Sequence, residues 1–348
     1  MEKNSQRLLN LANKRFSEVI RDGFQLFARN YGTLILPLAV FQIIIYILNS
    51  FLLTDLNLYV SSIEINIMDL MEQAVITPSD LNSIAQFLFF SIALLFVQNL
   101  IGALVITIAM CSVSNYIYNR YIYTETTFYP SFKSAFNTKI FLVILILGIL
   151  LPLSSILLIP SIFIFAFFIF LVFTYNIKGI KKPAHEARRV AKGAFWKIIC
   201  VFIINVMIIS TIRIFYTSFI SIFFSPNPNW FNPATRNYGM IILYDILINL
   251  VDILLAPLFI CLLTALFASQ KSRKDLGSSY QQRAYYVREE EYEPPSYLVK
   301  EKMETSEKDY IQEIQIEGKF YCPYCGVLVD RPKKFCPRCG ESLSFIDN

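Results

Sequence analysis

The sequence predicts an all-α polytopic membrane protein of about six transmembrane helices, with amphipathic helices at the membrane surface and a small β domain at the C-terminal end. Apolar residues make up 55% of the 348 residues and charged residues only 16%, and the mean hydropathy is +0.50. This balance lies well above that of a water-soluble domain. Long uncharged runs occur along the chain, and four of the seven cysteines cluster near its end.

Six apolar segments are suited to crossing a hydrocarbon core of about 30 Å, which takes about 20 helical residues. The uncharged run 140–177 is too long for one crossing and predicts a tight hairpin of two spans, with the turn marked by Pro152 and Pro160. The other spans are predicted at residues 31–54, from 86 to the charge at Arg120, at 198–219 and at 240–268.

The chain is predicted to begin with an amphipathic helix on the membrane surface. Apolar side chains recur at helical spacing from Leu8 to Phe27 with basic residues between them, a pattern typical of helices that lie in the interface. An acidic loop of helix-prone character, residues 55–80, is predicted between the first two spans. Composition then divides the chain into a surface helix (1–30), a transmembrane domain (31–268), a flexible charged linker (269–317) and a C-terminal domain (318–348).

The orientation is predicted from Lys and Arg, which accumulate in the cytoplasmic loops of membrane proteins. The three segments predicted on one side carry 6, 3 and 7 of these residues, whereas the three loops on the other side carry 0, 0 and 1. The first set is 1–30, 119–139 and 178–197, and the second is 55–80, 152–161 and 221–239. The sequence therefore predicts a multi-pass protein of the cell membrane with both termini in the cytoplasm.

A short amphipathic stretch of small and aromatic residues precedes three of the apolar runs, at Phe16–Phe27, Ser131–Phe136 and Ala184–Trp196. We interpret these as a threefold repeat of surface helix plus helical hairpin. In this pattern, residues 10–268 resemble the membrane domain of glycerophosphoryl diester phosphodiesterases, which implies a six-helix type of bundle. The catalytic barrel of those enzymes needs more than about 200 residues, and no part of this chain could hold it, so the activity is not carried over.

The C-terminal domain contains two C-x-x-C pairs, C-P-Y-C-G from Cys322 and C-P-R-C-G from Cys336. Each pair aims two thiolates at one point, so Cys322, Cys325, Cys336 and Cys339 are predicted to bind one structural Zn²⁺ tetrahedrally. The pattern resembles the short zinc-ribbon family, in which all four ligands match. The alternative is a redox-active or disulfide role, against which the predicted cytoplasmic location weighs.

The predicted core of the ribbon is small. It consists of Phe320, Val327, Val329 and Phe335, so metal binding is expected to supply most of the folding free energy. Basic residues of the ribbon could contact nucleic acid, but such residues are common in ribbons that bind only protein. We therefore expect a cytosolic protein partner and no nucleic acid.

Four polar residues fall inside the predicted fifth and sixth spans. A charged side chain is costly there, so it is expected to pair with another group or to serve a function. Arg213 and Asp245 lie at similar predicted depth, which suggests an ion pair, and Asp252 is predicted near mid-membrane. Asp245, Asn249 and Asp252 are spaced to share one helix face. One interpretation is that they hold helices together through hydrogen bonds with other polar side chains; the other is a cation or proton pathway centred on Asp252.

No soluble segment carries a catalytic constellation, so the sequence predicts a protein that is not an enzyme. The favoured hypothesis is a membrane-embedded adaptor or scaffold. Its basic surface helices would bind the bilayer through anionic lipid headgroups, and its zinc ribbon would recruit a partner. The alternative hypothesis is a small transporter or channel with the ribbon as a regulatory appendage.

Overall fold

The computed structural model describes residues 9–71, 78–123, 126–155, 157–177, 180–232, 236–290, 319–321, 328–330 and 335–336. Two compact units divide the chain. One is Val19–Leu266, and the other takes Met1–Glu18 together with Phe267–Asn348.

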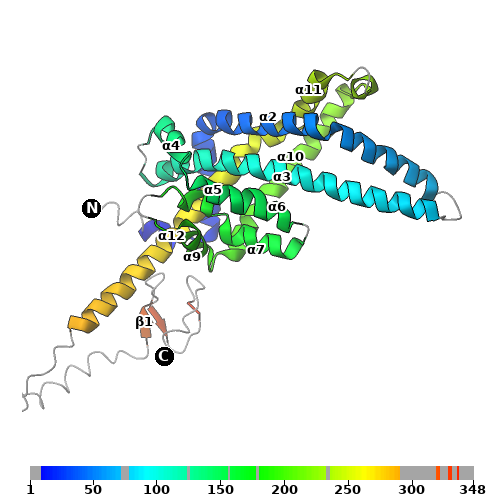
Figure 1. The fold of residues 1–348 in the computed structure, drawn as a ribbon. Coiled ribbons are helices and arrows are strands. Elements are labelled where there is room, and N and C mark those ends of the chain that lie inside the picture. The colour runs from blue at the N-terminus through cyan, green and yellow to red at the C-terminus, as the bar shows by residue number, and fades with distance from the viewer. Residues whose placement is uncertain are drawn as a thin grey trace, which may run out of the picture. The chain divides into compact units, whose positions relative to one another are not determined.

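Two very long helices open the larger unit, α2 (Phe16–Met71) and α3 (Pro78–Tyr123). Residues 16–71 were expected to form a surface helix, a span and an acidic loop, but they are one helix of 56 residues. A change from basic to apolar to acidic composition does not by itself break a helix, and α2 continues even through Pro37, which removes one backbone hydrogen bond. The two helices run side by side toward the connection between them (Figure 1), where the rings of Tyr59 and Phe90 pack 5.0 Å apart.

The uncharged run 140–177 forms two helical arms with a break between the two prolines, where the hairpin turn was predicted. The first arm is α5 (Ile140–Val143), the π-helix η1 (Ile144–Leu150) and α6 (Leu151–Ser154), and the second is α7 (Leu158–Phe168) and α8 (Leu171–Thr174). Before them, α4 (Phe128–Ala135) meets the first arm at a bend of 69°. The surface stretch predicted at Ser131–Phe136 is therefore a helix distinct from the span that it precedes.

The third surface stretch also forms a separate helix, α9 (Pro183–Ala191), followed by α10 (Phe195–Phe223). Gly193 joins them with a φ of 87°, a left-handed conformation that side chains with a Cβ rarely adopt. α9 is amphipathic, because Ala187, Val190 and Ala191 are buried while Arg188 and Lys192 are exposed.

The predicted sixth span is divided into two helices. A short 3₁₀ helix η2 (Pro228–Phe231) precedes α11 (Tyr238–Ile248), and α12 (Leu250–Glu290) follows after a break at Asn249. α12 also continues through residues 269–290, which were assigned to a flexible linker. The remainder of that predicted linker, 291–317, lies outside the described residues.

Among the described residues, four helices are long and apolar enough to cross a membrane, or five if the bent pair of α4 and the first arm is one span. The expected number was about six. The difference arises because the apolar helices 159–174 and 238–248 are each too short to pass as a span alone. The chain is an α-helical membrane protein.

Close packing around α12 forms the core of the larger unit. Cys261, Leu262 and Leu263 have no exposed surface, and a Cβ at Gly23 of α2 would lie 2.9 Å from the Cα of Leu262. A second junction forms at Tyr175, whose buried hydroxyl lies 3.1 Å from the carbonyl oxygens of both Cys111 and Ala135. Cys111 and Cys261 are buried, whereas Cys200 is exposed on α10.

In the smaller unit, Arg273 of α12 binds the beginning of the chain. Its Nε and Nη2 each donate a hydrogen bond of 2.6 Å, to the carbonyl oxygens of Ala12 and Lys14 respectively. These carbonyls follow the short helix at residues 9–13, and a guanidinium at a helix C-terminus satisfies acceptors that have no partner within the helix. Two antiparallel strands, β1 (Lys319–Tyr321) and β2 (Leu328–Asp330), complete the described residues of this unit, apart from 335–336.

Candidate functional site: a polar cavity between apolar helices

A cavity of about 560 Å³ lies between four helical segments of the larger unit. Its walls come from α2, from Gln98 of α3, from Arg213 of α10 and from residues 245–252 at the junction of α11 and α12. Most of the lining side chains are polar although the surrounding helices are apolar. α2 contributes a stripe of them at helical spacing: Tyr46, Asn49, Ser50, Thr54, Asn57 and Ser61.

The junction at Asn249 gives the cavity its shape. Both the backbone N–H and the side-chain Nδ2 of Asn249 donate to the carbonyl oxygen of Asp245, at 3.2 and 2.8 Å. The Asn249 carbonyl then accepts from the N–H of Asp252 at 3.0 Å. This local exchange of hydrogen bonds is how an Asn side chain competes with helical backbone pairing, and it ends one helix and starts the next. All three residues still line the cavity.

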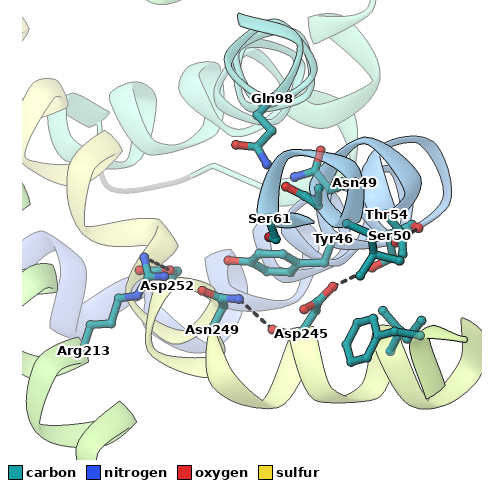
Figure 2. Close-up of a pocket in the computed structure, with 14 residues that line it drawn as sticks. Tyr46, Asn49, Ser50, Thr54, Ser61, Gln98, Arg213, Asp245, Asn249 and Asp252 are labelled. Carbon is teal, nitrogen blue, oxygen red and sulfur yellow. Dashed lines mark hydrogen bonds and ion pairs between the residues drawn. The ribbon is translucent and has the colours of Figure 1, made fainter. Parts of the chain in front are cut away.

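The expected partner of Arg213 was Asp245, but the structure pairs it with Asp252. Nη1 of Arg213 lies 3.2 Å from Oδ2 of Asp252, and the two side chains are 49% and 18% exposed. Asp245 instead accepts a 2.7 Å hydrogen bond from the hydroxyl of Ser50. Figure 2 shows the Arg213–Asp252 pair at one end of the cavity and Asp245 with Ser50 toward the other, with Asn249 between them.

Helix lengths give the distance of the Arg213–Asp252 pair from the basic residues. Arg213 lies 16 residues beyond Lys197 in α10, and Asp252 lies 19 residues before Lys271 in α12. At 1.5 Å per residue these separations are about 24 and about 28 Å. Asp252 is in the first turn of α12, so the pair is remote from the basic residues of both helices.

Contacts between α2 and the start of α11 hold the far end of the cavity. The ring of Phe51 stacks on Tyr238 at 4.9 Å, and Nη2 of Arg236 lies 2.6 Å from Oδ1 of Asp55. The hydrogen bond to Asp55 raises the pKa of the Arg236 guanidinium, which therefore stays charged at working pH. These contacts align α2 antiparallel to α11, so that Ser50 meets Asp245.

Sequence reasoning missed Ser50, Tyr46 and Arg236, although a signal was present. The polar residues of α2 recur every three or four positions from Tyr46 to Ser61, which is the spacing of one helix face. Gln98 of α3 also lines the cavity, and Gln42 donates to the hydroxyl of Tyr46 at 3.2 Å.

A second, smaller cavity of about 440 Å³ is basic and lies at α9, lined by Phe167, His185, Arg188, Arg189 and Lys192. The guanidinium of Arg188 lies over the ring of Phe167 at 5.9 Å, and Arg189 pairs with Glu186 at 2.7 Å. The residues predicted to bind anionic lipid at this helix thus surround a shallow basic site. Among them, Arg188 and Lys192 are exposed.

Only part of the predicted metal site lies within the described residues. Cys322, Cys325 and Cys339 lie outside them, whereas Cys336 is described and buried. Strand register pairs Tyr321 with Leu328, so the first C-x-x-C pair belongs to the six residues that connect β1 to β2. In that part of the chain which the structure describes, no group of three His, Cys, Asp or Glu residues could hold a metal ion.

The predicted core of the ribbon is only partly found among the described side chains. Val329 is buried, as expected, but Phe335 is 62% exposed. Phe335 precedes the buried Cys336 directly, so the two neighbouring side chains face opposite directions along an extended segment. The placement of Phe335 in the core was therefore wrong.

Comparison with protein-family models, with curated proteins and with solved structures finds no match to this chain. The fold and the cavity define its class directly. It is an α-helical membrane protein with a polar, charged cavity between apolar helices.

Proposed function

We propose that the protein is a non-enzymatic, membrane-embedded adaptor that displays a zinc-binding ribbon on the cytoplasmic side and recruits a protein partner through it. The observation that carries the proposal is the register of the C-terminal hairpin. Tyr321 opposite Leu328 leaves the sequence C-P-Y-C-G-V as the connection. A tight connection with two thiolates is the form in which one half of a four-cysteine zinc site is presented.

Zinc in this ribbon would have a structural role. The four thiolates of Cys322, Cys325, Cys336 and Cys339 would hold it, and closed tetrahedral coordination leaves no position for a substrate. A hairpin of two three-residue strands buries too little surface to fold alone, so the metal would supply the folding free energy. Tethering to the bilayer would then raise the local concentration of the ribbon near membrane-bound partners.

The cytoplasmic location is part of the proposal and has two supports. Basic residues gather at the ends of α2, α3, α10 and α12 that are remote from the cavity, as the positive-inside rule requires of cytoplasmic ends. The proposal counts the two arms within 140–177 as a hairpin of two crossings, in addition to the four helices that are long enough to span. That even number of crossings would return the C-terminal tail to the side of the N-terminus.

The adaptor proposal is tested by zinc analysis and affinity purification of the full chain in detergent. We expect the unaltered chain to contain one zinc and to co-purify with a set of proteins. In Cys322→Ser the zinc, the fold of the ribbon and these co-purifying proteins should all be lost. Cys200→Ser is the matched control, since Cys200 is exposed on α10, and it should keep the metal and the partners. Recovery of the same partners with Cys322→Ser as with the unaltered chain would contradict the proposal.

A second candidate function, a small carrier or channel, is favoured by the polar cavity and its Arg213–Asp252 pair, because buried ionisable groups in membrane helices often mark solute pathways. Reconstituted vesicles test it. The candidate would be supported by a flux of protons or small cations that falls in Asp252→Asn. The same flux should be kept in Asp275→Asn, a partly exposed residue that pairs with Lys271. Equal flux in both variants would exclude a pathway centred on Asp252.

A further inference from the structure

The charges that line the cavity do not balance. Arg213 pairs with Asp252, but no cationic side chain among the described residues pairs with Asp245, which accepts only from Ser50. A carboxylate held between apolar helices without a positive partner is costly. The cavity therefore lacks one positive charge near Asp245.

One acceptor that lines the cavity also lacks a donor. The side-chain Oδ1 of Asn49, which lines the cavity, is buried and has no hydrogen-bond partner in the part of the chain that the structure describes. Asp245 offers further lone pairs beside the one that Ser50 uses. A primary ammonium group supplies both missing elements, since it carries a positive charge and three N–H donors.

The opposite end of the cavity has hydrogen-bond donors without acceptors. Arg213 uses only Nη1 for Asp252, so its Nε and Nη2 donors have no partner among the described residues. A guanidinium with free donors is suited to phosphate or carboxylate. Asp245 and Asp252 lie on the two sides of the break at Asn249, toward opposite ends of the cavity (Figure 2). A ligand with an anionic group and an ammonium group separated by a short chain fits between the two ends.

Position and surroundings indicate where such a ligand comes from. The Arg213 side chain, at one end of the cavity, is 49% exposed. The side chains around Arg213 on α10 are apolar and exposed, at 44% for Ile212, 63% for Ile214 and 74% for Phe215. A lipid whose headgroup entered the cavity could therefore lay its acyl chains along this face of α10.

We propose that the cavity binds a zwitterion carrying a phosphate and a primary ammonium group, with the phosphate at Arg213 and the ammonium at Asp245, and that its source is the phosphoethanolamine headgroup of a phospholipid. This inference concerns the occupant of the cavity. It holds whether or not anything is carried across the membrane, and it is independent of the zinc ribbon.

Binding to the full chain in detergent micelles tests the proposal, with short-chain phosphatidylethanolamine as the probe. Short-chain phosphatidylglycerol shares the phosphate but has no ammonium, and short-chain phosphatidylcholine has no N–H donor. We expect phosphatidylethanolamine to bind at least about tenfold more tightly than either, the effect of an unpaired buried charge. Equal affinity for phosphatidylethanolamine and phosphatidylglycerol would overturn the proposal.

Free O-phosphoethanolamine distinguishes the two sources of the same headgroup. Binding much weaker than that of the lipid assigns the headgroup to a phospholipid, whereas equal binding would overturn the lipid source. Asp245→Asn should remove the preference for phosphatidylethanolamine, and Asp275→Asn, far along α12 from the cavity, should keep it. If Asp245→Asn does not fold, the comparison of lipids on the unaltered chain still decides.

Discussion

Two apolar helices, α12 and α3, have nearly the same hydropathy and opposite environments. In the most apolar stretch of α12, 67% of the residues are buried inside the protein, whereas in that of α3 only 11% are buried. Membrane association makes both environments compatible with an apolar sequence, because lipid chains are as apolar as a protein core. Hydropathy therefore finds the spans without telling which helix is central.

Small and polar residues distinguish α12 from the first half of α3, although Ser112 and Ser114 in the second half of α3 are also buried. α12 carries Thr264, Ser269 and Gln270 in buried positions, and such residues mark interfaces between membrane helices. The exposed face of α3 carries large side chains instead, such as Leu88, Phe89 and Ile92. The contrast implies that α12 contributes packing energy, while the outer part of α3 contributes solubility in lipid.

The largest difference is expected from removing the same side chain in each helix. Leu263 of α12 is fully buried, and Leu95 of α3 is 59% exposed. Leu263→Ala leaves a cavity and should lower the free energy of unfolding by about 2 kcal/mol or more, whereas Leu95→Ala should change it by less than about 0.5 kcal/mol. Titration of the folded protein with a denaturing detergent measures the free energy of unfolding of both variants. Equal effects would show that burial in α12 does not contribute stability.

A smaller effect is expected where α2 meets α12. A Cβ at Gly23 would lie 2.9 Å from the backbone of Leu262, while nothing lies within 4 Å of a Cβ at Gly32. Gly23→Ala should separate the helices and destabilise the protein by about 1–3 kcal/mol. Gly32→Ala, in the same helix, should stabilise it by up to about 1 kcal/mol through helix propensity. Thermal unfolding of the two variants compares them directly, and a stable Gly23→Ala would refute the close approach.

The smallest effect is expected at the end of α12 that lines the cavity. Asp252→Asn removes the charge opposite Arg213 and should cost about 1 kcal/mol, as polar contacts within membranes do. Asp275→Asn, at a pair that is partly exposed, should cost less than about 0.5 kcal/mol. The same unfolding assay measures both. A stable Asp252→Asn would show that Arg213 does not depend on its partner.

Sequence reasoning found the helices more successfully than their ends. The turn between Pro152 and Pro160 was located because proline marks a break, and the surface helix α9 was located from its amphipathic pattern. The break at Asn249 could not be found, because it depends on a side-chain hydrogen bond to Asp245. The continuity of α2 was missed because charge, which sets depth in the membrane, was used to place helix ends.

The residues of the candidate site were only partly predicted, because their pairing depends on helix ends. Arg213, Asp245 and Asp252 stood out because charges are rare in apolar spans, but their pairing depends on where α11 ends and α12 begins. The polar stripe of α2 could have indicated Ser50, but its pairing with Asp245 depends on α2 lying against α11, which the contact of Asp55 with Arg236 establishes. Contacts between distant segments are the part of a site that one sequence leaves open.

Orientation of the chain is the proposal on which the adaptor depends, and labelling by a membrane-impermeant thiol reagent tests it most directly. In a chain without other cysteines, Ser225→Cys is placed between α10 and η2, and Ser296→Cys in the tail. The account predicts that intact cells label only Ser225→Cys and that permeabilised cells label both. Labelling of Ser296→Cys in intact cells would contradict the cytoplasmic placement of the tail.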